Sequence, residues 1–263
     1  MELRPLGETG ILVSPLGLGT VKLGRNQQVK YPEPFEIPDD KAVVDLLSLA
    51  RELGVNLLDT APAYGNSEER LGQLLPGPRD EWVIVSKVGE FFEGGKSRFD
   101  FSYETTIRTV EQSLRNLKRD YLDAVLIHSD GDDYRVLKQE GALDALRALK
   151  EKGLIRAHGM STKTLVGGLL AVVDTDIVMV TCNPDYQEEL PVIRAADLRM
   201  RGVLIKKALQ SGHIEAGEVE EAMKFIFAQP GVSSVMIGTI TPNHLRDNIA
   251  AVEAAIKACS GVA

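Results

Sequence analysis

The stretch NLLDTAPAYGNSEERLG, residues 56–72, contains the signals of a strand, a loop and a helix in succession. An apolar run, Val55–Leu58, ends at an aspartate, and the loop that follows carries Tyr64. Glu68 and Glu69 stand at the start of the expected helix, where acidic side chains are favoured by the helix dipole. The stretch therefore predicts a strand followed by a helix, and the same order recurs along the chain.

Short β-branched or leucine-rich runs alternate with amphipathic helical runs over most of the sequence. The expected strands are Leu16–Gly19, Val55–Leu58, Trp82–Ser86, Leu122–Ile127, Ile155–Gly159, Ile177–Thr181, Val203–Ile205 and Val235–Ile237. The expected helices are Asp39–Leu53, one from about Ser67, Tyr103–Leu117, Leu143–Glu151, Lys163–Val173, Glu189–Arg199, Glu218–Phe227 and Pro242–Ala258.

Eight strand–helix pairs in 263 residues predict an α/β fold, a closed (β/α)₈ TIM barrel. We expect residues 1–263 to form a single barrel domain, in which residues 1–15 make an N-terminal β-hairpin that turns at Glu8–Gly10. A doubly wound open sheet is the alternative, but no glycine-rich GxGxxG turn follows a strand.

The composition narrows the class of protein. A formal net charge of −8 argues against nucleic acid as a main partner, because phosphate binding needs a clustered cationic face. The two cysteines offer no disulfide framework or metal site, and the start of the chain lacks the apolar segment of a signal peptide. No apolar run is long enough for a membrane span. We expect a cytoplasmic protein with no metal, and the sequence indicates no oligomeric state.

Polar side chains follow three consecutive expected strands. Asp59 follows the second, Lys87 the third and His128 the fourth, and Tyr64 lies in the loop after Asp59. Active sites of (β/α)₈ barrels gather at the carboxyl ends of the strands, so we expect these four side chains to converge. Taken singly, each is more often a cap, a solvated loop residue or a hydrogen-bonded loop histidine; their coincidence favours a site.

This combination of residue types suits proton transfer. A free tyrosine has a pKa of about 10, too high for easy donation near neutrality. Lys87 would stabilise the phenolate, and Asp59 would keep the ammonium charged and oriented. We expect Lys87 to lower the pKa of Tyr64 by about 2 units, which needs roughly 2.7 kcal/mol. Tyr64 then serves as general acid for reducing a carbonyl, which His128 helps to position.

The motifs NLLDTAPAYGNSEERLG, VIVSKVG and VLIHS, in this order and spacing, resemble the aldo-keto reductase family. The resemblance covers essentially the whole chain, from RPLGETGILVSPLGLGT to IGTITPNHLRDNI. It implies a (β/α)₈ barrel that transfers a hydride between a nicotinamide cofactor and an aldehyde, ketone or alcohol. It also implies a catalytic tetrad of Asp59, Tyr64, Lys87 and His128, with Tyr64 as proton donor.

The resemblance further implies a set of cofactor contacts along the strand ends and the last helix. They are Gly19, Thr20, Asp59, Ser161, Thr162, Asn183, Lys206, Ala208, Leu209, Ser211, Gly238, Thr239, His244, Asp247 and Asn248.

Several of these positions depart from the family pattern. Thr162 replaces an asparagine beside Ser161, and Met179 replaces a glutamine that helps to hold the carboxamide, a role in which Asn183 is a substitute. Lys206 stands where many relatives place an aromatic ring against the nicotinamide. Gly238 and His244 replace the cations that commonly clamp the 2′-phosphate, and bidentate phosphate recognition favours Arg. We expect NADP(H) to be preferred, with NAD(H) possible.

Three functions remain open from the sequence. The first is a carbonyl reductase or alcohol dehydrogenase acting on a small molecule. The second is an NADP(H)-binding regulatory or sensor subunit with little turnover, to which the departures at Met179 and Lys206 point. The third is a Schiff-base lyase with Lys87 as nucleophile, which needs a depressed lysine pKa that Asp59 opposes.

Overall fold

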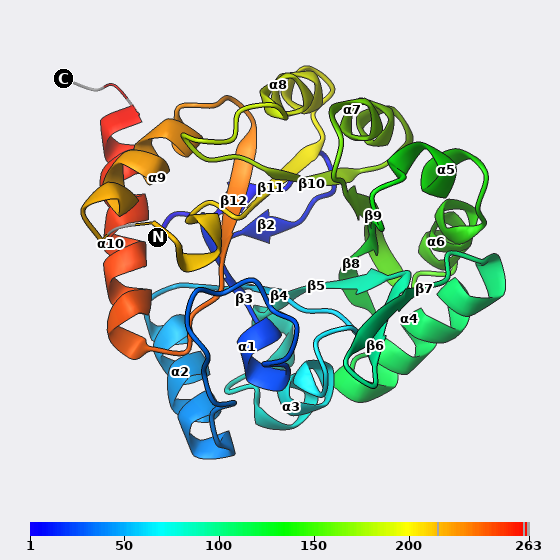
Figure 1. Ribbon diagram of the computed structural model, residues 1–263, viewed down its shortest axis with the longest axis horizontal. Helices are drawn as coiled ribbons and strands as arrows, with labels where there is room; N and C mark the ends of the chain where they lie inside the picture. The colour runs from blue at the N-terminus through cyan, green and yellow to red at the C-terminus, as the bar shows by residue number, and fades with distance from the viewer. Residues whose placement is uncertain (215, 260, 262–263) are drawn as a thin grey trace.

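Eight parallel strands close into a barrel in the computed structural model, which describes residues 1–214, 216–259 and 261 (Figure 1). The barrel strands are β3 (Leu16–Gly19), β4 (Leu57–Asp59), β5 (Val83–Val88), β8 (Leu122–His128), β9 (Ile155–Ser161), β10 (Ile177–Thr181), β11 (Gly202–Lys206) and β12 (Val232–Ile237). They follow one another around the barrel in chain order, and β12 pairs with β3 to complete the ring. The predicted (β/α)₈ barrel is confirmed.

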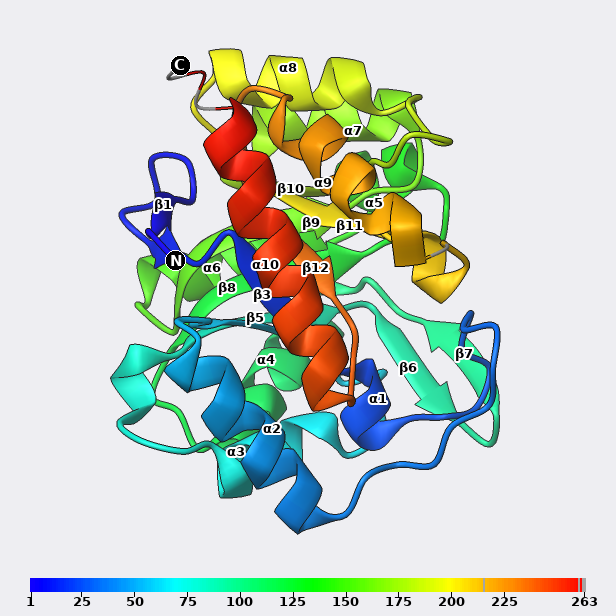
Figure 2. The ribbon, with the colours of Figure 1, turned by 90° about the vertical axis from the view of Figure 1, so that its left-hand side faces the viewer.

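Helices surround the barrel and bury its outer face (Figure 1). The helices that follow barrel strands are α2 (Asp40–Glu52), α3 (Ser67–Leu74), α4 (Tyr103–Leu117), α6 (Ala142–Glu151), α7 (Leu165–Asp174), α8 (Leu190–Leu198), α9 (Val219–Phe227) and α10 (Pro242–Cys259). Shorter elements are α1 (Val21–Gly24), α5 (Asp133–Lys138) and the 3₁₀ turns Arg79–Glu81, Gln210–Gly212 and Ala216–Glu218. The long α10 packs against α9 along the side of the barrel (Figure 2).

Local sequence explains how these helices begin. The side chain of Asp39 accepts a hydrogen bond from the backbone N–H of Ala42 at 2.8 Å, which caps α2. Thr164 caps α7 in the same way through Gly167. Among the described residues, no helix has both the length and the apolar character needed to cross a membrane.

Successive side chains along each barrel strand face opposite sides of the sheet, which gives one apolar core inside the barrel and another between the barrel and the helices. Side chains such as Leu57, Val85, Leu126 and Leu204 point into the barrel, while their neighbours pack against the helices. At the N-terminal end, Leu6 of the predicted hairpin joins the interior cluster. That hairpin pairs β1 (Arg4–Pro5) with β2 (Leu12–Val13), which confirms it and closes the bottom of the barrel.

The strands run further than the sequence predicted. β5 continues through Val88, so Lys87 lies within the strand rather than after it, and β8 includes His128. The acidic run Asp130–Asp133 ends in a buried residue. Asp133 begins α5 and accepts hydrogen bonds from the backbone N–H groups of Lys163 and Thr164.

The segment after β5 forms an antiparallel hairpin that is not among the expected strands. It pairs β6 (Glu90–Glu93) with β7 (Lys96–Phe99), and Gly94 and Gly95 make the turn at φ +57° and +76°. Two glycines with positive φ are the usual requirement of a tight hairpin turn, so the signal was present in the sequence. The hairpin stands beside the loop that follows α1, at the end of the barrel opposite the N-terminal hairpin (Figure 2).

Candidate active site

The four candidate catalytic residues line one cavity at the carboxyl ends of the barrel strands. Asp59, Lys87 and His128 each come two residues after an interior core residue, namely Leu57, Val85 and Leu126. Successive inward positions on a strand are two residues apart, so these polar side chains form the next layer above the apolar barrel core. The predicted convergence of the four is confirmed as geometry.

A buried ion pair joins the second and third barrel strands. Nζ of Lys87 donates to Oδ1 of Asp59 at 2.5 Å and to the carbonyl oxygen of Thr60 at 3.0 Å. Burial by itself would lower the pKa of Lys87, but Asp59 and Tyr64 outweigh it and the pKa is raised. Lys87 therefore stays an ammonium ion, which counts against a Schiff-base nucleophile.

Tyr64 stands beside this pair, on a loop held by close backbone contact. A Cβ on Gly65, whose φ is +61°, would lie 2.0 Å from the carbonyl oxygen of Gly24, so only glycine fits there. Nζ of Lys87 lies 4.8 Å from the Tyr64 ring centroid. Burial nevertheless raises the pKa of Tyr64 above its ordinary value, and Lys87 only partly offsets this. The expected lowering is therefore wrong, because desolvation disfavours the phenolate more than Lys87 favours it.

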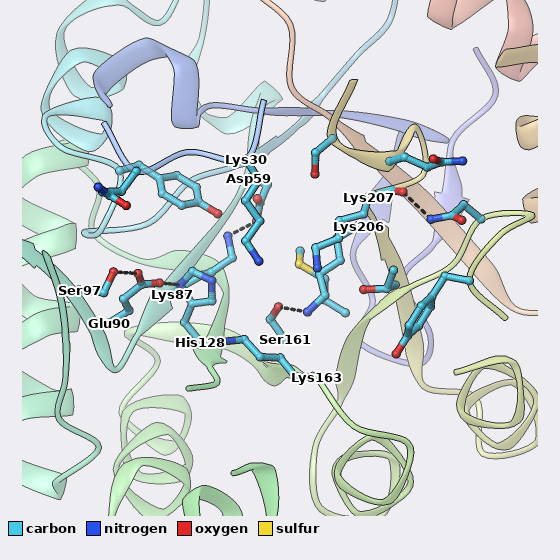
Figure 3. Close-up of a pocket in the computed structure, with 18 of the residues that line it drawn as sticks. Lys30, Asp59, Lys87, Glu90, Ser97, His128, Ser161, Lys163, Lys206 and Lys207 are labelled. Atoms are coloured by element: carbon cyan, nitrogen blue, oxygen red, sulfur yellow. Dashed lines mark hydrogen bonds and ion pairs between the residues drawn. The ribbon is translucent and has the colours of Figure 1, made fainter. Parts of the chain in front are cut away.

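His128 contacts a carboxylate that sequence reasoning missed. Its Nδ1 is buried and lies 2.9 Å from Oε2 of Glu90, the first residue of β6 (Figure 3). The contact is bent, since Nδ1 forms no hydrogen bond of good linear geometry among the described residues. The ring of Tyr64 meets the His128 ring edge-on, with centroids 6.3 Å apart.

Lys206 occupies the other side of the cavity. Its Nζ donates to Oγ of Ser161 at 2.9 Å and to the carbonyl oxygen of Thr162 at 2.5 Å (Figure 3). Burial lowers the pKa of Lys206 to about 8, against an opposing attraction from Glu189. At the position where many relatives are expected to have an aromatic ring, this chain therefore has an ammonium group held by two hydrogen bonds.

The cavity has a volume of about 860 Å³ and is rich in cations. Lysine side chains enter it from the loop after α1, from the loop after β9 and from the end of β11 (Figure 3). The charged residues of its lining are Arg25, Lys30, Lys87, Lys163, Lys206 and Lys207 against Asp59, Glu90 and Asp185. The chain as a whole carries a net charge of −8, so the excess of positive charge is local to this cavity lining.

No metal centre is seen in the part of the chain that the structure describes, where no group of three or more His, Cys, Asp or Glu side chains is placed to hold a metal ion.

Residues 15–188 match the model of the aldo/keto reductase family. The chain belongs to this family. A solved structure of a Pseudomonas aeruginosa protein classed with the aldo-keto reductases is 50% identical, with a TM-score of 0.90 over 97% of this chain and 96% of that chain. L-Galactose dehydrogenase of Arabidopsis thaliana is 29% identical over 296 residues, covering 96% of this chain and 88% of that protein.

A third relative bears on the cofactor. The NADH-specific methylglyoxal reductase of Escherichia coli is 33% identical over 172 residues, covering 60% of this chain and 51% of that protein. As an aldo/keto reductase, this protein is an oxidoreductase of a family that uses nicotinamide cofactors and acts on small carbonyl compounds.

Only some of the aldo/keto reductase cofactor positions reach the cavity. Those that line it are Asp59, Ser161, Asn183, Lys206 and Ser211. Met179 lines it as well, and the amide nitrogen of Asn183 is already engaged with the carbonyl oxygen of Lys207 at 3.0 Å.

The positions near the first strand and after β9 and β11 lie beneath the cavity surface. Thr20 is buried and donates to the carbonyl oxygen of Asp59 at 3.0 Å, next to Gly19 at the end of β3. The hydroxyl of Thr162 donates to Glu189 at 3.1 Å, so it points away from the cavity. Ala208 is buried in the outer core and Leu209 is packed against that core.

The remaining expected cofactor positions are not among the cavity lining and lie around the end of β12 and the start of α10. Gly238 is covered by Tyr31, whose hydroxyl would lie 2.5 Å from a Cβ at that position. Thr239 accepts from the backbone N–H of Thr241 at 3.1 Å. On α10, His244 and Asp247 are exposed and Asn248 is buried.

Several cavity residues carry no motif that points to them. Glu90 and Ser97 arrive on the β6–β7 hairpin, and Lys163 follows β9. His213 also lines the cavity, and its Nε2 lies 3.3 Å from the carbonyl oxygen of Lys30. Glu68, expected only to favour a helix start, is buried and accepts from Oγ of Ser86 at 2.6 Å.

Proposed function

We propose that this aldo/keto reductase transfers a hydride between a nicotinamide cofactor and the carbonyl carbon of a small aldehyde or ketone, or the reverse from an alcohol, with Tyr64 as proton donor. The observation that carries the proposal is the buried Lys87–Asp59 pair with Nζ 4.8 Å from the Tyr64 ring centroid. A fixed ammonium group beside a phenol is the arrangement that proton donation to a developing alkoxide requires.

Each residue of the proposed site has a separate role in the reaction. A reduced nicotinamide cofactor, when bound, would supply the hydride for reduction. Tyr64 gives its proton to the carbonyl oxygen, and the ammonium group of Lys87 stabilises the phenolate that remains. Asp59 holds Lys87 in its charged form. In oxidation the phenolate of Tyr64 takes the hydroxyl proton back.

The cavity suits an anionic dinucleotide. Oγ of Ser161 accepts from Lys206, so its own proton is available for a carboxamide oxygen. Met179 beside it provides no hydrogen bond, and Lys206 takes the place of the missing polar partner. Ser211 and Lys207 line the cavity on the side of β11, where they would hold phosphate oxygens.

We further propose that NADP(H) is preferred and NAD(H) accepted. Support comes first from Thr239, whose hydroxyl would lie near the 2′-phosphate. It comes also from the N-terminal end of α10, where Pro242 opens the helix and the helix dipole favours a phosphate. A titration of both reduced cofactors by tryptophan or nicotinamide fluorescence decides between them. Tighter binding of NADH than of NADPH would reverse the assignment.

We also propose that residues 1–263 act as a single barrel domain in the cytoplasm. Cys182 is buried, Cys259 is exposed and both thiols are free, which suits a reducing compartment.

The proton donor is tested by Tyr64→Phe. We expect carbonyl turnover to fall by about 10²-fold or more, because the acid is lost, while cofactor binding stays within about twofold. Tyr134→Phe, at an exposed position on α5, is the matched control and should retain activity. Undiminished turnover in Tyr64→Phe would remove the assignment. Tight cofactor binding by the parent protein with no turnover of any aldehyde, ketone or alcohol would favour the regulatory subunit instead.

A further inference from the structure

Glu90 is held in one place by three separate groups. Its Oε1 accepts from Oγ of Ser97 at 2.6 Å across the β6–β7 hairpin, and the guanidinium of Arg25 lies 3.8 Å from the same oxygen. Its other oxygen, Oε2, lies 2.9 Å from Nδ1 of His128. The carboxylate is only 13% exposed, so the hairpin delivers a fixed and largely buried charge to the catalytic histidine.

Glu90 stays ionised at every pH well above 2. Burial acts to raise its pKa, but His128, Ser97 and Arg25 together outweigh burial and lower the pKa to about 2. An ionised carboxylate can only accept hydrogen bonds.

The short contact therefore decides which ring nitrogen carries the proton. An unprotonated Nδ1 would be repelled by a carboxylate oxygen 2.9 Å away even in a bent contact, so this separation favours a proton on Nδ1 of His128. We propose that Glu90 is a positioning residue that keeps the His128 proton on Nδ1, so that Nε2 is an acceptor in the neutral ring and a donor only in the imidazolium. No sequence motif assigns this role to Glu90.

The consequence for chemistry rests on the function proposed above. A neutral His128 whose Nε2 bears a lone pair accepts a hydrogen bond from an alcohol substrate or from the Tyr64 hydroxyl. It cannot donate to a carbonyl oxygen until the ring is protonated. Glu90 thereby makes the two directions respond differently to pH: reduction needs the imidazolium, and oxidation needs the neutral ring.

Every charged group around the ring bears on that protonation. Burial lowers the pKa of His128, Glu90 from β6 raises it, and Lys87 from β5 and Lys206 from β11 lower it. Tyr64 meets the ring edge-on. Removing the charge of Glu90 removes the group that raises this pKa, so the histidine should protonate at still lower pH.

The variant Glu90→Gln keeps the shape and removes the charge. The Ser97 hydroxyl donates to Oε1 and so favours the amide oxygen on its side, which turns the amide NH₂ toward Nδ1. That geometry reverses the tautomer and places the His128 proton on Nε2. Glu93→Gln, at the exposed far end of β6, is the matched control on the same hairpin.

Nitrogen NMR of ¹⁵N-histidine-labelled protein tests the tautomer directly. We expect the parent and Glu93→Gln proteins to show a protonated Nδ1 and an unprotonated Nε2 in the neutral ring, and Glu90→Gln to show the reverse. We also expect the His128 pKa to fall by about one to two units in Glu90→Gln alone. A proton on Nε2 in the parent protein, or equal pKa values in the two variants, would overturn the proposal.

Kinetics test whether the tautomer matters to the reaction. In Glu90→Gln the reductive pH profile should lose its dependence on His128 protonation, so that the ratio of reduction to oxidation above neutral pH rises by about tenfold. An unchanged ratio would remove the catalytic consequence. The NMR result is read without any substrate, so a protein that reduces no carbonyl compound would refute the proposed function and leave the tautomer assignment standing.

Discussion

Nζ of Lys87 lies 2.5 Å from Oδ1 of Asp59, and the two side chains are only 2% and 8% exposed. They come from neighbouring barrel strands, and each occupies the inward position directly above the apolar barrel core. A buried charge that loses its partner is strongly destabilising, so this pair joins the chemistry of the site to the stability of the barrel.

Asp59→Asn should therefore lower both stability and activity. We expect the free energy of unfolding to fall by about 3 kcal/mol, because Lys87 is left buried without its counter-charge. Urea unfolding followed by circular dichroism measures this. Asp45→Asn removes the exposed partner of Lys41 on α2 and serves as control, with no measurable loss. Equal stability of the two variants would show that the buried pair contributes nothing.

Lys206→Met should change how stability depends on pH. Burial lowers the pKa of Lys206 to about 8, below its ordinary 10.5. Between these values the unfolded chain binds more protons than the folded one, so the parent protein gains stability as pH rises from 8 to 10.5. Relative to the parent, the variant should lose on the order of 2 kcal/mol over this range. Urea unfolding at several alkaline pH values checks this, and a constant difference would contradict it.

His158→Gln should remove a contribution to the free energy of unfolding that is lost at acid pH. Burial lowers the pKa of His158 to about 4, while Asp176, 3.9 Å away, opposes the shift and Lys150, Arg147 and Arg201 add to it. The neutral ring contributes its stability fully above pH 6.5 and loses it as pH falls toward 4.

The acid range therefore distinguishes the His158→Gln variant from the parent. Between pH 6.5 and 4 we expect the parent to lose on the order of 2 kcal/mol more stability than the variant. Thermal unfolding in matched buffers measures the difference. The stability of His244→Gln, changed at an exposed position on α10, should depend on pH as that of the parent does. Parallel curves of stability against pH for all three proteins would show that His158 makes no such contribution.

Gly89→Ala should disturb the junction between the barrel and the β6–β7 hairpin. Gly89 has φ +101°, and a Cβ there would lie 2.2 Å from the ring of Phe101. We expect a loss of at least about 2 kcal/mol from the backbone conformation and the overlap together. Gly153→Ala has a φ of +74° but no atom within 4 Å, so it should lose only about 1 kcal/mol. Thermal unfolding compares the stabilities of the two variants. Similar losses of stability would show that the Phe101 ring can move aside at little cost.

The sequence was sufficient for the barrel and for the convergence of the tetrad, for a local reason. A parallel strand needs a short apolar run, and a residue at its carboxyl end points inward or outward according to its distance from the core residues before it. Asp59, Lys87 and His128 all keep the inward parity, so their convergence follows once the barrel closes.

The hairpin and its carboxylate could not be derived in that way. Gly94–Gly95 signalled a turn, but nothing local indicates that Glu90 would reach Nδ1 of His128, which belongs to another strand. The same holds for Lys206. Its place at the end of a strand could be read from the sequence, but the hydrogen bond from its ammonium group to Ser161 could not.

The sequence by itself determined the order of strands and helices, the barrel and the residues at its mouth, because those depend on periodicity and on position along each strand. Only the tertiary structure decided which groups touch and how their protons are held. Burial raised the pKa of Tyr64 against the expectation from Lys87, and a distant hairpin brought Glu90 to His128. Desolvation and charge proximity depend on everything packed around a group, and a local stretch of sequence does not contain that information.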